Sequence, residues 1–218
     1  MVALGIIAPG KMLLGAIFAF GVACAFGLGL VFFGGWPLIA VGAVCVLFAT
    51  LYSAGPLPLA RCGFGDFLVV FFFGVVAVCY TFFLQTKIWN FEMIAAGLAV
   101  GFATDNILIA NNYRDRREDR THGKWTLIAL FGERFGRYFY LASGILAATF
   151  FLVVTLRLRG GLGLFPLLAP LLWLALHVKT WRRLCAIREG AALNEILEKS
   201  AKNLIAFALL FAMQTIPL

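Results

Sequence analysis

The sequence has little charge and lacks the cysteine and histidine patterns expected of a zinc or redox protein. Only 13% of its 218 residues are charged, whereas 63% are hydrophobic and the mean hydropathy is +0.98. Since a soluble domain does not need so much apolar surface, this composition excludes one and indicates a polytopic membrane protein. The five cysteines form no C-x-x-C pair, and His122 and His177 have no ligand spacing. Neither a disulfide framework nor a zinc site is therefore predicted.

Long apolar runs are what the sequence has instead. Seven of them are long enough, or nearly so, to cross the hydrocarbon of a bilayer. We therefore predict an all-α fold, a polytopic membrane helical bundle of about seven transmembrane helices that forms a single membrane domain over residues 1–218. Pro9-Gly10 predicts a loop directly before the first helix. The predicted helices are 12–33, 36–52, 67–86, 91–112, 138–156, 162–180 and 203–217.

Basic residues are distributed unevenly between the two sides of this predicted bundle. The loops after the second, fourth and sixth helices hold 14 of the 18 Lys and Arg residues. By the positive-inside rule, these loops and the N-terminus are predicted to be cytoplasmic, in a multi-pass protein of the inner (cytoplasmic) membrane. We attribute the net charge of +8 to these cytoplasmic loops, where basic residues would face anionic lipid headgroups. Nucleic-acid binding is not predicted, because no basic patch is interleaved with aromatic residues in a soluble module.

The densest charge lies at residues 111–127, which read NNYRDRREDRTHGKWTL. If the preceding apolar helix continues, Asn111, Asp115 and Asp119 fall at i, i+4 and i+8 and share one face. Carboxylates about 6 Å apart can share a hydrated Mg²⁺, which also accepts substrate phosphates. The interleaved arginines and Lys124 suit contacts to the same phosphate oxygens. The pattern therefore indicates a magnesium-diphosphate site at a membrane surface; the alternative is a solvated cytoplasmic loop whose charges balance.

Two other places carry candidate site residues. In the loop after the second helix, where Gly55-Pro56 predicts a turn, Tyr52 is a candidate hydrogen-bond donor to phosphate and Asp66 a candidate to close the pocket. The alternative for this loop is an ordinary interfacial hairpin. Asp105 lies within an apolar run, where a charged group usually faces a cavity or a partner; a structural role is the alternative. Residues 179–202 predict an amphipathic connection between the last two helices, and we assign no catalytic or binding role to it. The candidate polar partners of Asp105 are Tyr80, Thr81 and Gln85.

Residues 111–127 and 52–74, the latter reading YSAGPLPLARCGFGDFLVVFFFG, resemble the UbiA superfamily of intramembrane aromatic prenyltransferases, in particular its 1,4-dihydroxy-2-naphthoate polyprenyltransferase branch. A weaker likeness is LNEILEKSAKNLIAFALLF near the end. The resemblance implies Mg²⁺-dependent transfer of a polyprenyl group from polyprenyl diphosphate to an aromatic acceptor, dihydroxynaphthoate, in menaquinone synthesis. It implies that Asp115 and Asp119 are metal ligands and, with Lys124, catalytic. The substrate-binding residues implied are Asn111, Asn112, Arg114, Tyr52 and Asp66.

The sequence also departs from that family pattern. Family members have nine helices and two Asp-rich motifs, whereas this chain has room for seven helices and contains one D-x-x-x-D pair. We therefore expect about two N-terminal helices and the first motif to be missing; the alternative is a naturally short, inactive chain. Arg61 and Asp105-Asn106 replace aromatic or apolar residues of the naphthoate branch, which leaves the acceptor open. The alternative function is non-catalytic binding of prenyl diphosphate or quinone precursors. A phosphatidyltransferase ranks lower, because its D-G-x-x-A-R opening is absent.

Overall fold

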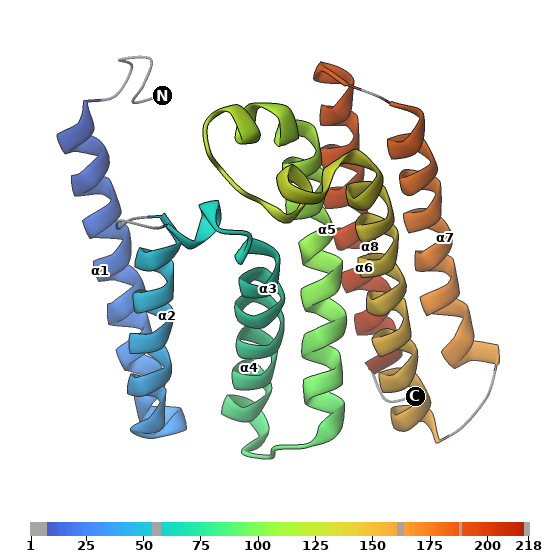
Figure 1. The fold of residues 1–218 in the computed structure, drawn as a ribbon. Helices are drawn as coiled ribbons and strands as arrows, with labels where there is room; N and C mark the ends of the chain where they lie inside the picture. The colour runs from blue at the N-terminus through green and yellow to red at the C-terminus, as the bar shows by residue number, and fades with distance from the viewer. Residues whose placement is uncertain (1–7, 54–57, 161–163, 188, 216–218) are drawn as a thin grey trace.

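The structure, a computed structural model, describes residues 8–53, 58–160, 164–187 and 189–215, so the predicted Gly55-Pro56 turn lies outside it (Figure 1). The described residues form helices and no strand, which confirms the all-α prediction. The continuous segment made by α3, η2 and α4 counts as one long helix, and seven long helical segments stand where seven were predicted. The elements are α1 (Pro9–Gly34), α2 (Pro37–Ser53), η1 (Leu59–Arg61), α3 (Gly65–Val69), η2 (Val70–Val76, π-helical), α4 (Ala77–Thr86), α5 (Phe91–Thr121), α6 (Leu127–Arg159), α7 (Leu164–Ala186), η3 (Ala191–Leu193) and α8 (Asn194–Thr215).

Among the described residues, four segments are long and apolar enough to cross a membrane: α1, the continuous segment Gly65–Thr86, α5 and α6. Helix α2 is equally apolar over 17 residues, which is at the lower limit for crossing the hydrocarbon. In a bilayer, backbone polar groups must be satisfied within the segment, and helices achieve this. The chain is thus a multi-pass membrane protein.

The starts of α1 and α6 correct the sequence prediction. Helix α1 begins at Pro9 and not after a Pro9-Gly10 loop, because proline is tolerated in the first turn, where its missing N–H needs no partner. Helix α6 begins at Leu127, well before the predicted residue 138. Its start is fixed by Thr126, whose Oγ1 accepts a hydrogen bond from the backbone N–H of Ala129 at 3.2 Å.

Helix α8 also begins earlier than predicted, at Asn194 and not at residue 203. Its first turns are charged, but their side chains pair along the helix: Lys199 with Glu195 at 2.7 Å, and Lys202 with Glu198 at 2.5 Å. Such i, i+4 pairs stabilise a polar helical turn, so the apolar run alone underestimates the length of the helix.

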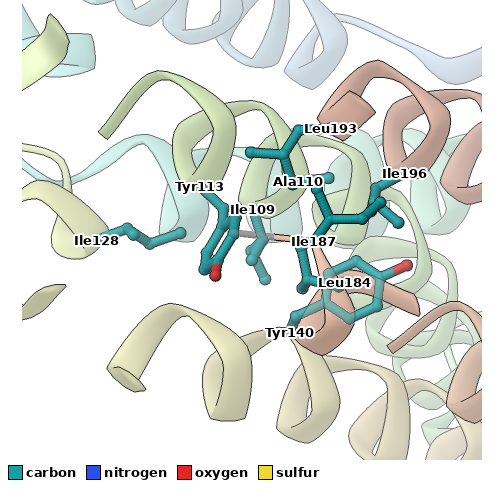
Figure 2. Packing of buried hydrophobic residues seen from close by; sticks show 9 residues of the cluster. All are labelled: Ile109, Ala110, Tyr113, Ile128, Tyr140, Leu184, Ile187, Leu193 and Ile196. Atoms are coloured by element: carbon teal, nitrogen blue, oxygen red, sulfur yellow. The ribbon is translucent and has the colours of Figure 1, made fainter. Parts of the chain in front are cut away.

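Two clusters of buried side chains hold α5, α6, α7 and α8 together. The first, shown in Figure 2, places the buried face of α5 against α6, α7, α8 and the connection between α7 and α8. The residues 111, 115 and 119 lie on roughly the opposite side of α5, given 100° per residue. The first cluster is Ile109, Ala110, Tyr113, Ile128, Tyr140, Leu184, Ile187, Leu193 and Ile196. The second, closer to the other end of the bundle, is Ala99, Ala103, Ala147, Ala148, Phe151, Ala169, Trp173 and Phe207.

Glycines allow the Gly65–Thr86 segment to approach α5 closely. A Cβ added to Gly74 would lie 2.4 Å from the carbonyl oxygen of Gly97 and 2.6 Å from the Cα of Gly101. Small residues let helix backbones come together in this way inside membranes. This contact fixes α3, which carries Asp66, beside α5.

Helices α1 and α2 stand at one edge of the molecule (Figure 1). Helix α1 has no buried residue, and it packs mainly on α2 and α4. An apolar cavity of about 870 Å³ lies between α1 and α2. Since lipid tails are as apolar as these side chains, such exposure is compatible with a bilayer.

Candidate functional site

Three loops meet at one end of the bundle, those that follow α2, α5 and α7 (Figure 1). Arg61 joins the first two: its Nη2 donates to the carbonyl oxygen of His122 at 2.7 Å, and its own carbonyl accepts from the N–H of Trp125 at 2.8 Å. Arg117 joins the second and third through two hydrogen bonds to Glu189, one of them 2.6 Å long. The three loops predicted to share one side therefore do so.

Arg114 organises the acidic stripe of α5. Its guanidinium donates to both carboxylate oxygens of Asp115, at 2.6 and 2.7 Å, and to Oδ1 of Asn111 at 2.9 Å. A fourth hydrogen bond, 3.0 Å long, reaches Oδ1 of Asn194 at the start of α8. These contacts require α5 to continue past the apolar run, and it does so as far as Thr121. A bidentate arginine pair is directional, so it orients both the cation and the carboxylate.

Lys124 folds back over the end of α5. Its Nζ lies 3.2 and 3.1 Å from the two carboxylate oxygens of Asp119, and its backbone N–H donates to the carbonyl of Asp119 at 2.8 Å. Gly123, at φ +64°, supplies the left-handed turn that reverses the chain between them. Asp119 is buried, with only 8% of its surface exposed, so its charge depends on Lys124 for compensation.

These groups surround an open cavity of about 560 Å³, which we call the outer cavity. Its lining includes three carboxylates and three permanent cations, a combination that can bind an anion together with a hard metal ion. In the described part of the chain, no three His, Cys, Asp or Glu residues converge as a complete metal site. Magnesium needs only one or two carboxylates and takes water and phosphate oxygens elsewhere, so Asp115 and Asp119 fit it as a donor set. The lining residues are Arg61, Arg114, Asp115, Glu118, Asp119, His122 and Lys124.

A second, smaller cavity of about 240 Å³, the inner cavity, lies between the loop after α2 and helix α5. Lys124 lines both cavities, so they adjoin at its side chain. Each of the eight catalytic and substrate-binding residues implied by the family resemblance lines one cavity or the other. The lining of the inner cavity is Tyr52, Ala60, Gly63, Gly65, Asp66, Leu108, Asn111, Asn112, Lys124 and Thr126.

Asp66 and Asp105 are both buried, at 4% and 1% exposure, and in the described structure Oδ1 of each has no hydrogen-bond partner. Asp66 lines the inner cavity, whereas Asp105 lines neither cavity and lies one helical turn beyond Leu108. The partners suggested for Asp105 do not provide the bond; Gln85, for example, donates to the carbonyl of Thr81. Because an unpaired buried carboxylate is costly, this pair marks a polar region beneath the inner cavity.

The connection between α7 and α8 is the part of the site that the sequence analysis missed. It was predicted to carry no chemistry, yet Asn194 bonds Arg114 and Glu189 bonds Arg117. Its own geometry is fixed by Glu195, which accepts hydrogen bonds from Arg183 and pairs with Lys199. The hydrogen bond from Arg183, followed by that from Lys199, lowers the pKa of Glu195 to about 2. No local signal points to this role, apart from the polar start of an amphipathic helix.

The fold and these paired cavities define a multi-pass helical membrane protein with adjoining cavities, lined by acidic and basic side chains, at one end. The model of the UbiA prenyltransferase family matches residues 2–193, and the chain belongs to this family. The family suggested by the sequence is therefore confirmed.

Several curated relatives carry the name 1,4-dihydroxy-2-naphthoate octaprenyltransferase. The Mycobacterium leprae protein is 29% identical over 204 residues, which are 94% of this chain and 67% of the relative. The Bacillus subtilis protein is 32% identical over 152 residues (70% and 48%), and the Escherichia coli protein 30% identical over 178 residues (80% and 56%). The chain thus spans about half to two thirds of the length of these relatives. No solved structure matches it significantly.

Proposed function

We propose that this chain performs Mg²⁺-dependent transfer of a polyprenyl group from polyprenyl diphosphate to an aromatic acceptor, 1,4-dihydroxy-2-naphthoate, in menaquinone synthesis. The names of its relatives support this substrate pair, and the family supports the class of reaction. The observation that carries the proposal is the junction of the two cavities at Lys124. A charged site for diphosphate directly beside a smaller pocket with buried polar side chains, such as Asp66 and Asn112, is the arrangement that the reaction requires.

The outer cavity is proposed to hold the diphosphate. Arg114 and Lys124, now bonded to Asp115 and Asp119, would donate to phosphate oxygens, while the two carboxylates would hold the metal ion. When bound, Mg²⁺ would neutralise charge on the departing diphosphate. Tyr52 would donate its phenolic hydrogen to a phosphate oxygen near the junction. Donors that are already oriented stabilise the leaving group where its charge develops.

The reaction is proposed to occur at the junction of the cavities. The carbon–oxygen bond of the allylic diphosphate breaks, and its electron pair leaves with the diphosphate. The ring of the acceptor attacks the allylic carbon, and loss of the ring carboxylate as carbon dioxide restores aromaticity. In the inner cavity, Asp66 and Asn112 would orient the acceptor through hydrogen bonds, since both are buried and polar. Seclusion from water protects the allylic cation from hydrolysis.

We further propose that the chain resides in the cytoplasmic membrane, with the end that carries both cavities facing the cytoplasm. The basic loops of residues 114–137 and 179–202 support this orientation through the positive-inside rule. The soluble headgroup of the donor and the acceptor would then enter from the cytoplasm, while the polyprenyl chain stays in the bilayer.

Product formation by the purified chain tests the proposal. The protein in detergent is incubated with octaprenyl diphosphate, dihydroxynaphthoate and Mg²⁺, and the prenylated product is measured by mass spectrometry. We expect turnover that chelation of Mg²⁺ abolishes. Asp115→Asn should lower the rate about 100-fold or more, because it removes a charge at the leaving group. The matched control is Glu92→Gln, which removes one charge from the opposite end of α5 and should retain activity.

A second candidate function is binding of prenyl diphosphate or quinone precursors without transfer, since the sequence has one D-x-x-x-D pair where the family uses two. Equilibrium binding of radiolabelled octaprenyl diphosphate separates the two functions. Metal-dependent binding that Asp115→Asn weakens, without any product, would favour the second candidate. Turnover by Asp115→Asn at the wild-type rate would refute the role given to this carboxylate.

A further inference from the structure

A third cavity, of about 510 Å³, lies outside the proposed active site, between α6 and α7. Arg134, Arg137 and Tyr138 line it from α6, and Trp181 and Cys185 line it from the last turns of α7. Because α6 starts and α7 ends at the loop end of the bundle, this cavity lies at the same membrane surface as the outer cavity (Figure 1).

The cavity carries an excess of positive charge. Among the described residues that line it, Glu133 is the one acid, and it is bonded by both Arg137 and Arg116, the latter at 3.2 Å. Within the described part of the chain, Arg134 has neither a hydrogen bond nor an ion pair, and the residue is exposed. An exposed guanidinium that lines a cavity and has no such partner is available to bind a phosphate.

The backbone adds to this preference. Gly132 has φ +85° and breaks α6, so the long part of the helix starts at Glu133, beside the cavity. The positive end of its dipole is therefore directed at the site, where it favours an anion. Arg137 is held in place by its hydrogen bond to the phenol of Tyr113 at 3.0 Å and by that from Trp181 to its carbonyl at 2.9 Å.

The surroundings distinguish a lipid from a soluble anion. Tyr138 is 56% exposed, and a tyrosine and a tryptophan beside arginines are typical of the membrane–water interface. Further into the bundle, Ile145 of α6 and Leu171 of α7 are 45% and 57% exposed. They lie seven residues from Tyr138 and ten residues from Trp181, which is about 10 and 15 Å along their helices, so an acyl chain has apolar surface to follow.

From these observations we propose that the cavity between α6 and α7 binds the phosphate headgroup of an anionic phospholipid. Arg134 and Arg137 contact the phosphate, Tyr138 and Trp181 pack beside the glycerol region, and the acyl chains lie along α6 and α7. The site is separate from the proposed reaction and would tie this pair of helices to an anionic leaflet.

Quenching of Trp181 fluorescence tests the proposal directly. The full chain in a neutral detergent is titrated with phosphatidylglycerol brominated near the headgroup end of its acyl chains, and phosphatidylcholine with the same bromines is the comparison. The signal is the difference between wild type and Trp181→Phe, which removes the contribution of the other four tryptophans. We expect quenching by phosphatidylglycerol to saturate, with an apparent dissociation constant at least about fivefold lower than that for phosphatidylcholine. Each basic residue near the membrane surface raises the affinity for an anionic lipid by roughly a factor of five.

Three variants decide whether the cavity is responsible. Arg134→Gln should weaken the quenching by phosphatidylglycerol about fivefold, and Arg134→Lys should retain most of it. Arg182→Gln is the matched control, because Arg182 is exposed on the same turn of α7, does not line the cavity, and loses the same charge. Arg134 is exposed and has no hydrogen bond or ion pair in the described structure, so its variants should keep the melting temperature of the wild type.

Each result bears on the proposal. Equal quenching by both lipids, an Arg134→Gln variant that binds like wild type, or an equal loss in Arg182→Gln would overturn it. Displacement of the lipid by millimolar inorganic phosphate or glycerophosphate would also overturn it and would assign the cavity to a soluble anion.

Discussion

Replacing Gly74 by alanine tests the close approach between the Gly65–Thr86 segment and α5. The added Cβ would lie 2.4 Å from the carbonyl oxygen of Gly97 and 2.6 and 2.9 Å from the Cα and N of Gly101, whereas ordinary contacts begin near 3.4 Å. All three neighbours are backbone atoms, so no side-chain rotation can relieve the overlap. The two helices must therefore separate by about 1 Å in a closely packed interior.

Two opposing effects determine how much the Gly74→Ala substitution changes the free energy of unfolding. Overpacking of this kind costs about 1–3 kcal/mol, and the upper half of that range applies because only backbone can move. Alanine is better than glycine within a helix by up to about 1 kcal/mol, which offsets part of the cost. We expect a net loss of about 2 kcal/mol, which for a chain of this size lowers the melting temperature by about 4–8 °C.

Thermal unfolding in a mild detergent, followed by circular dichroism, measures this loss. The matched control is Gly21→Ala in α1, since a Cβ there meets no atom within 4 Å. Its melting temperature should stay the same or rise, because only the helix preference changes. A Gly74→Ala variant as stable as wild type, or an equal loss in both variants, would refute the tight contact.

Three other predictions concern the loop end of the bundle. Asn194→Ala should raise KM for prenyl diphosphate about 3- to 10-fold in steady-state assays while changing kcat little, because Arg114 loses one of its hydrogen bonds but keeps Asp115. Glu195→Gln should lower the melting temperature at pH 7 but not near pH 2: the pKa of Glu195 falls from about 4.5 to about 2 on folding, so its contribution is present above pH 4.5 and lost as pH falls to 2. The exposed thiol of Cys62 should react with an impermeant maleimide in inside-out vesicles and not in right-side-out cells, with Cys62→Ser as the control; the reverse pattern would contradict the proposed orientation.

Local patterns in the sequence predicted the acidic stripe correctly. The positions of Asn111, Asp115 and Asp119 follow from helical periodicity alone, once α5 continues to Thr121. That the loops after α2, α5 and α7 share one end of the bundle followed from the predicted number of helices, which depends on topology and not on packing. Together with the stretch 52–74, the stretch 111–127 that contains these residues was sufficient to name the family.

Contacts between distant parts of the chain could not be predicted in this way. Asn194 is 80 residues from Arg114, and their hydrogen bond depends on how α8 packs against α5. The early starts of α6 and α8 were missed because hydropathy marks only the apolar part of a helix, whereas Thr126 and the pair Glu195–Lys199 determine where these helices begin. Likewise, the two cavities and the depth of Asp66 depend on the approach between α3 and α5.

The position of Lys124 in the walls of both cavities has a thermodynamic consequence. A ligand in the outer cavity that draws the ammonium away from Asp119 changes the wall of the inner cavity as well. The affinities for the two ligands are then coupled, and by linkage each ligand changes the affinity of the other by the same factor. We expect prenyl diphosphate and acceptor to bind interdependently, which titration of each in the presence of the other would measure. In Lys124→Met the coupling factor should fall toward one, so that the two cavities behave as independent sites.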